Sequence, residues 1–211
     1  MATASVRKKA AGSYHHGELR RALLDATLRI VEREGTGAVS LSAAARRVGV
    51  SPQASYNHFR DKGALLAAAA EETVRALGAE MRKAVTAAGS PGERFEATGV
   101  AYLVYASEHA ARLRLLSAPE LADKSNHPEL AAAYDEAFAV LVEAIEACQR
   151  AGVVRKSDPR RLAIAAWSTV HGASWLLVDG QLATTGAPLE PRALARQTMR
   201  TLFKGFAPRV T

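Results

Sequence analysis

Apolar residues recur at helical spacing along most of this chain. Between residues 18 and 34 they are separated by four, three and four positions, with arginines on the other faces: Leu19, Leu23, Ala26 and Ile30. This pattern predicts an amphipathic helix, and Gly35 and Gly37 predict its end.

Two short helices are predicted directly after it. Ser40 offers a hydroxyl that can cap a helix over residues 41–48, and Gly49 can adopt the left-handed conformation that ends it. Ser51 and Pro52 predict the start of a second short helix, to about residue 59, because proline needs no N–H at the first helical position.

A long alanine-rich helix follows, capped by Asp61 and extending to about residue 85. Two short helices joined at a glycine and braced by a longer one are typical of a helix-turn-helix, whose second helix can enter the major groove of DNA. A helix of two turns is not stable alone. Its polar side chains therefore face either solvent, on a small bundle, or a partner, and the pattern leaves both open.

The second half of the chain is helical too, with breaks at 89–95, 117–130, 155–159 and 184–191 that separate about five further helices. We therefore predict an all-α protein of about nine helices. A flexible basic arm (1–12) precedes a helix-turn-helix DNA-binding domain (13–65). The long helix (61–85) connects that domain to a larger helical regulatory and dimerisation domain (86–211).

Charge is distributed unevenly along the chain. Of the 28 Lys and Arg and 21 Asp and Glu, residues 1–65 hold 11 basic and 5 acidic side chains, a surplus of +6 out of the total of +7. A basic surplus confined to one segment is typical of a polyanion partner such as DNA. The arm with Arg7, Lys8 and Lys9 can follow phosphates or stay solvated.

Several classes of protein are disfavoured. No apolar run reaches the roughly 18 residues that a bilayer requires and no signal peptide is evident, so we expect a cytoplasmic protein that does not contact membranes. Cys148 is the single cysteine, and His15 and His16 lack further ligands, so we expect no metal and no cofactor. The scattered histidines and the absence of a phosphate loop argue against an enzyme.

The stretch YHHGELRRALLDATLRIVEREGTGAVSLSAAARRVGVSPQASYNHFRDKGALL (14–66) resembles the N-terminal domain of the tetracycline-repressor (TetR) family. The ARRVGVS turn at 45–51 and the YNHF motif at 56–59 carry the resemblance. It implies a homodimeric, all-helical transcriptional regulator, usually a repressor, with a small-molecule pocket in its C-terminal domain. Ala44, Ser55 and Gly63 depart from the residues usual in the family.

Roles in DNA binding follow from side-chain chemistry and from this resemblance. Gln53 and Asn57 can pair with adenine edges, and Ala54 can contact a thymine methyl group. The resemblance places Tyr56, His58 and Lys62 on phosphates. Residues at the two helix starts complete the expected DNA contacts, with hydroxyls and backbone N–H groups at the first of them available to phosphates: Ser40, Ser42, Ser51 and Pro52.

A row of aromatic residues marks the second half of the chain. Trp167, His171 and Trp175 are spaced by four, and the Trp-x-x-x-His-Gly pattern resembles a TetR subgroup named for those letters. The row predicts either a ligand pocket or plain packing of the core or of a dimer interface. The other residues that we expect in such a pocket are Tyr102, Tyr105, His109 and Phe138.

These features predict a ligand-responsive repressor that binds a palindromic double-stranded DNA operator as a homodimer and is released by a small-molecule effector. A transcriptional activator with the same architecture, or a helical adaptor that binds only proteins, are the alternatives. We expect the dimer to form through residues 159–179 and an apolar seam on the last helix, unless that seam is buried within one subunit: Leu194, Thr198, Leu202 and Phe206.

Overall fold

The computed structural model describes residues 16–187 and 189–208, and within these residues the chain is all-α, as predicted. The nine α-helices are α1 (His16–Glu34), α2 (Leu41–Val48), α3 (Pro52–Tyr56), α4 (Lys62–Ala87), α5 (Pro91–Glu108), α6 (Ala110–Leu115), α7 (Pro128–Arg150), α8 (Pro159–Val178) and α9 (Pro191–Phe206). Three short 3-10 helices connect them: η1 (Thr36–Ala38), η2 (Pro119–Leu121) and η3 (Lys124–Asn126). The basic arm (1–12) and His15 lie outside the described residues.

The predicted caps explain where the first helices begin and end. Ser40, Ser51 and Asp61 each accept a hydrogen bond from a backbone N–H three residues further on, and Gly49 has a φ of 83°. Helix α3 is shorter than predicted. Its carbonyl at Ser55 accepts from two successive N–H groups, and the resulting turn places Phe59 in the core.

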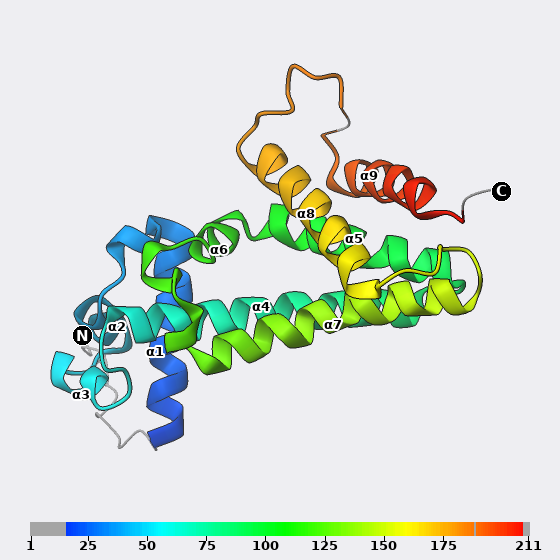
Figure 1. Ribbon diagram of the computed structural model, residues 1–211. Helices are drawn as coiled ribbons and strands as arrows, with labels where there is room; N and C mark the ends of the chain where they lie inside the picture. The colour runs from blue at the N-terminus through cyan, green and yellow to red at the C-terminus, as the bar shows by residue number, and fades with distance from the viewer. Residues whose placement is uncertain (1–15, 188, 209–211) are drawn as a thin grey trace, which may run out of the picture.

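The long helices form one layered bundle (Figure 1). Helices α4 and α7 run side by side in the same direction away from the α1–α3 unit, and α5 returns along both. A Cβ at Gly78 would lie 3.3 Å from the Ala137 Cβ, so a small residue is needed where α4 meets α7. Helices α8 and α9 lie across α5, on the side away from α4 (Figure 1).

Two apolar cores fill this arrangement. The boundary between them does not coincide with residue 65, where the DNA-binding domain is predicted to end. The first joins α1, α2, Phe59 and the first half of α4 to Leu115 at the end of α6, to Ala118 and Leu121 of the following segment, and to the start of α7. The second holds the outer halves of α4 and α7 together with α5, α8 and α9. The helix-turn-helix therefore shares its core with part of the C-terminal region. No helix in the described ranges combines the length and apolarity that a membrane span requires.

Candidate DNA-binding surface and ligand cavity

Helix α3 is held by a small buried surface. Ala44 and Ala45 of α2 are fully buried beneath it. Ser55 is 1% exposed, and its hydroxyl donates to the Pro52 carbonyl at 2.6 Å, so its polar group is satisfied. The small residues at 44 and 55 thus let α2 and α3 pack closely, and they fix which face of α3 points outward.

That outward face is polar and carries no charge. Gln53 and Asn57 are exposed one turn apart, and Tyr56 is 52% exposed. Ala54 and His58 are half-buried beside them. Four further predicted contacts lie exposed at the starts of α2 and α3: Ser40, Ser42, Ser51 and Pro52. Nine of the ten predicted DNA contacts thus lie on α2, α3 and the residues next to them, and the tenth, Lys62, is the first residue of α4.

Lys62, which is predicted to contact a phosphate, forms an ion pair within the chain. Its Nζ lies 3.0 Å from Oε1 of Glu120, which belongs to η2. Hydrogen bonds from its own backbone N–H and from Lys62 hold the pKa of Glu120 below its ordinary value. The ion pair joins the start of α4 to the loop between α6 and α7, 58 residues further along the chain. Sequence reasoning did not identify Glu120, because nothing in its local sequence marks the pairing.

Most arginines near α3 are engaged with acidic groups or rings. Arg21 contacts Asp25 and Glu72, and other ion pairs join Arg47 to Glu34 and Arg60 to Asp61. The guanidinium of Arg20 lies 5.2 Å from the centre of the Phe59 ring.

Arg46 differs from these arginines. It is exposed on α2 one turn after Ser42, and no ion pair involves it within the described residues. The spacing of four from Ser42 could have identified it as a candidate phosphate contact.

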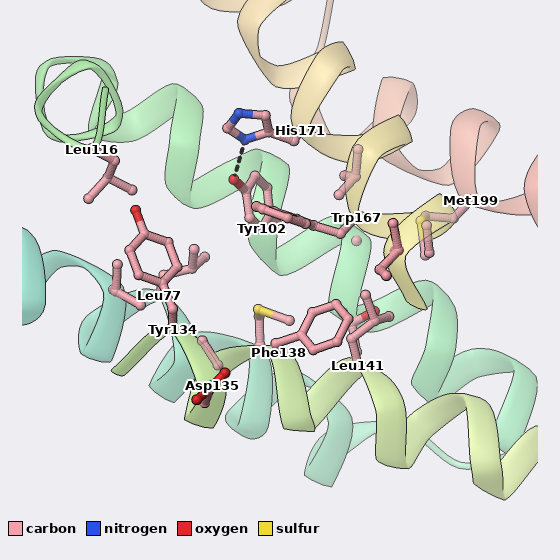
Figure 2. A pocket seen from close by; sticks show the side chains of 18 of the residues that line it. Leu77, Tyr102, Leu116, Tyr134, Asp135, Phe138, Leu141, Trp167, His171 and Met199 are labelled. Atoms are coloured by element: carbon pink, nitrogen blue, oxygen red, sulfur yellow. Dashed lines mark hydrogen bonds between the residues drawn. The ribbon is translucent and has the colours of Figure 1, made fainter. Parts of the chain in front are cut away.

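A cavity of about 560 Å³ lies between α4, α5, α7 and α8. Its walls are mainly aliphatic and aromatic (Figure 2). Tyr102 and His171 lie on one side, while Tyr134 and Phe138 of α7 lie opposite. The volume falls within the range of about 300–1,000 Å³ that is usual for small-molecule sites.

Four of the seven residues predicted for a pocket line this cavity: Tyr102, Phe138, Trp167 and His171. The other three do not. Tyr105 is buried and donates to the Thr73 carbonyl at 3.3 Å, and its ring packs on His109, 4.6 Å between centres. His109 stands at the break between α5 and α6, and Trp175 lies behind His171. The positions of these three residues in α5, at its end and in α8, rather than the chemistry of their side chains, keep them out of the cavity lining.

Sequence reasoning missed other lining residues. Tyr134 precedes Phe138 by one turn on α7, a spacing that could have identified it. Leu116 and Ser117 also line the cavity, from the loop that carries Glu120. A loop residue carries no periodic pattern, so only the folded chain reveals this proximity.

The polar end of the cavity is built around His171. Its Nδ1 lies 2.7 Å from the Tyr102 hydroxyl, and its Nε2 accepts from the Trp175 indole N–H at 3.0 Å. Burial lowers the pKa of His171 below its ordinary value of 6.5. Burial likewise raises the pKa of Tyr102 to about 12, against an opposing hydrogen bond from Trp167. Both groups are therefore neutral near pH 7.

The candidates for other chemistry are few. Cys148 is fully buried, and desolvation raises its pKa to about 11, so it is a poor nucleophile. Among the described residues, no cluster of three His, Cys, Asp or Glu side chains is placed to hold a metal ion.

Comparisons with known proteins agree with this architecture. Residues 95–202 match the family model "Tetracyclin repressor-like, C-terminal domain", and residues 23–69 match "Bacterial regulatory proteins, tetR family". The HTH-type transcriptional regulator BetI of Rhizobium meliloti is 42% identical over 82 residues, 37% of this chain and 38% of that protein. BetI of Brucella canis is 33% identical over 78 residues, 37% of this chain and 39% of that protein. The matches thus span well under half the length of these curated relatives.

Solved structures resemble the chain over nearly its whole length. A protein of unknown function from Rhodococcus sp. RHA1 has a TM-score of 0.81 and 32% identity, covering 93% of this chain and 100% of that one. The TetR family regulator PfmR from Thermus thermophilus has a TM-score of 0.65 and 20% identity, covering 88% and 99%. The second likeness concerns the fold alone.

Proposed function

This chain belongs to the TetR family of DNA-binding transcriptional regulators, which are not enzymes, and from that premise we propose that it is a repressor released from its operator by a small molecule. The observation that supports this role most directly is the exposed, uncharged face of α3, which is anchored on its other side through the buried Ser55. Because its partner is DNA, we place the protein in the cytoplasm.

We assign base recognition to the side chains at the centre of the exposed face of α3. Gln53 and Asn57 each offer a donor and an acceptor side by side, which matches adenine in the major groove. Ala54 lies between them for contact with a thymine methyl group. Tyr56 and His58 orient the helix through phosphates, as do Ser40, Ser42 and Arg46 of α2 and its cap.

The operator is palindromic because the protein acts as a dimer. Half-sites about 34–36 Å apart require two copies of α3 held at a matching distance. We assign the interface to the outer faces of α8 and α9, where Thr169, Thr198 and Leu202 line a shallow groove and Leu176 is 40% exposed. Leu194 and Phe206 of the expected seam are instead buried within their own subunit. They therefore support the position of α9 rather than the contact between copies.

Release by a ligand requires a connection from the cavity to the DNA-binding surface. The loop after α6 supplies one, because Leu116 and Ser117 line the cavity while Ala118 and Leu121 pack in the core of the helix-turn-helix. Glu120 of the same loop contacts Lys62. A ligand that displaces Leu116 thus moves the start of α4 and changes the spacing of the two recognition helices.

Selection from random double-stranded DNA with the purified protein tests the proposal. We expect enrichment of a palindrome whose half-sites are about one helical turn apart. N57A should then lose about 1–3 kcal/mol of binding free energy on the selected site and little on random DNA. R46A should weaken binding to both and reduce the salt slope by about 1. Selection without enrichment would overturn the assignment of α3 as a reading helix, and a reporter under the selected site measures the sign of regulation.

A further inference from the structure

The hydrogen-bond direction at the polar end of the cavity is fixed by Trp175. An indole N–H can only donate, so Nε2 of His171 must accept the 3.0 Å hydrogen bond from it. A neutral imidazole has one acceptor and one donor nitrogen, which places the ring proton on Nδ1. The 2.7 Å contact between Nδ1 and Tyr102 is therefore a bond that His171 donates.

Tyr102 is consequently left with its own hydroxyl hydrogen. Its oxygen accepts from His171, so the phenolic hydrogen takes no part in that bond. Because Tyr102 lines the cavity, this hydrogen can be donated to an acceptor atom of a bound ligand (Figure 2). Thr98, a neighbouring hydroxyl, already donates to the Phe95 carbonyl at 2.7 Å. The cavity thus presents the Tyr102 hydroxyl as a hydrogen-bond donor against mainly apolar walls, which also carry the hydroxyls of Ser117 and Tyr134.

The cavity also lacks a positive charge. None of its lining residues is a lysine or an arginine, and its carboxylate, Asp135, lies on the exposed side of α7. His171 cannot easily become the missing cation, because a proton on Nε2 would face the Trp175 N–H. A buried carboxylate on a ligand would remain unpaired, at a cost of several kcal/mol. A ligand cation would meet the positive end of the Tyr102 O–H dipole.

We propose that the cavity binds an uncharged ring compound with one carbonyl or ether oxygen, which accepts a hydrogen bond from Tyr102. Four aromatic rings favour a flat apolar body: Tyr102, Tyr134, Phe138 and Trp167. The inference rests on the proposed function only in taking this cavity as the effector site.

Four naphthalenes that differ in one substituent test the ligand class by calorimetry on the full chain: acetylnaphthalene, ethylnaphthalene, naphthoate and naphthyltrimethylammonium. We expect the acetyl compound to bind about twofold to tenfold more tightly than its ethyl counterpart, the contribution of one neutral hydrogen bond. The anion and the cation should bind at least about tenfold more weakly than the acetyl compound. Equal binding of the acetyl and ethyl compounds, tightest binding of either ion, or no binding at all would overturn the inference.

Single-residue variants test whether the preference for the acetyl compound arises from the hydrogen bonds that link Trp175, His171 and Tyr102. Y102F should abolish the preference for acetyl over ethyl. Y105F is the matched control, because it removes a buried hydroxyl from the same helix outside the cavity, and it should keep the preference. W175F does not touch the cavity, yet it should reduce the preference, since His171 can then move its proton to Nε2 and accept from Tyr102. A preference that survives in both Y102F and W175F would contradict the assignment.

Failure of the ligand class and failure of the proposed function give different results. If the acetyl compound shows the expected preference but leaves operator affinity unchanged, the site stands and its role as effector site fails. If the preference is absent while another small molecule releases the operator, the ligand class fails and the regulatory role stands.

Discussion

Protonation of His171 should destabilise the folded chain, because the imidazole is partly buried. Burial holds its pKa below 6.5, so the unfolded chain takes up the proton at a higher pH than the folded chain does. The stability contributed by the neutral imidazole is complete above about pH 6.5 and is lost as the pH falls towards the folded pKa. We expect the free energy of unfolding in urea to fall between about pH 7.5 and pH 5 by more in the wild type than in H171Q.

The two tryptophans provide an independent check of the same titration. Trp167 and Trp175 are the only tryptophans of the chain, and their rings lie 5.8 and 6.2 Å from the His171 ring. Protonation of His171 should break its bond with Trp175 and quench the indole emission in wild type but not in H171Q. An identical acid response in the two proteins would mean that His171 is not the titrating group.

Gly99 shows how one missing side chain shapes the cavity wall. A Cβ at this position would lie 2.4 Å from both Cγ and Sδ of Met199, so α5 and α9 meet here without intervening atoms. We expect G99A to lower the free energy of unfolding by about 1–3 kcal/mol. The collision of the added methyl group with Met199 should cost more than the roughly 1 kcal/mol that alanine gains over glycine in helix propensity. Thermal unfolding of G99A, M199A and the double variant measures this. The double variant should lose less than the sum of the two singles, and strict additivity would show that the two residues do not collide.

At the scale of the elements, the ion pair between α4 and η2 sets how much charge the protein presents to DNA. Lys62 cannot bind a phosphate fully while it stays 3.0 Å from Glu120. E120Q should strengthen binding to operator and random DNA alike, by about twofold to fivefold at low salt, and the gain should shrink at high salt.

Glu129 offers the matched control for this charge change. It is exposed in the first turn of α7, and no ion pair joins it to the described residues. E129Q alters the net charge equally, so it should leave binding nearly unchanged. A gain in E120Q that persists in a K62A background would show that the effect does not pass through Lys62.

The sequence predicted elements well where a local chemical signal marks them. The N-caps Ser40, Ser51 and Asp61 and the left-handed Gly49 were all identifiable, because capping needs only neighbouring residues. The break at His109 was not predicted, since neither glycine nor proline marks it.

The cavity was only partly predictable for a related reason. Its walls combine positions far apart in sequence, and helical spacing alone could not tell whether Trp175 faces the cavity or supports His171 from behind. The pairing of Lys62 with Glu120 likewise depends on how α6 and its loop return to α4.

The whole molecule acts only if two copies hold their recognition helices at the spacing of one DNA turn. Binding two half-sites through one rigid body makes the second contact intramolecular, which raises affinity by about 100-fold or more over one half-site. T169R places a charge on the outer face of α8, in the groove that we assign to the partner copy. We expect a monomer in sedimentation analysis, about 100-fold weaker binding to the full operator, and unchanged binding to a single half-site.

Thr86 offers a closely matched control for this variant. Like Thr169, it is an exposed helical threonine whose hydroxyl donates to the carbonyl four residues earlier, at 2.9 Å against 2.7 Å for Thr169. T86R carries the same added charge on α4, away from α8 and α9, so it should remain dimeric and bind the full operator as the wild type does. If T169R also stays dimeric, the partner copy does not cover this face of α8. If it becomes a monomer that still binds the full operator tightly, operator binding does not depend on the dimer, and the two-fold account of recognition is wrong.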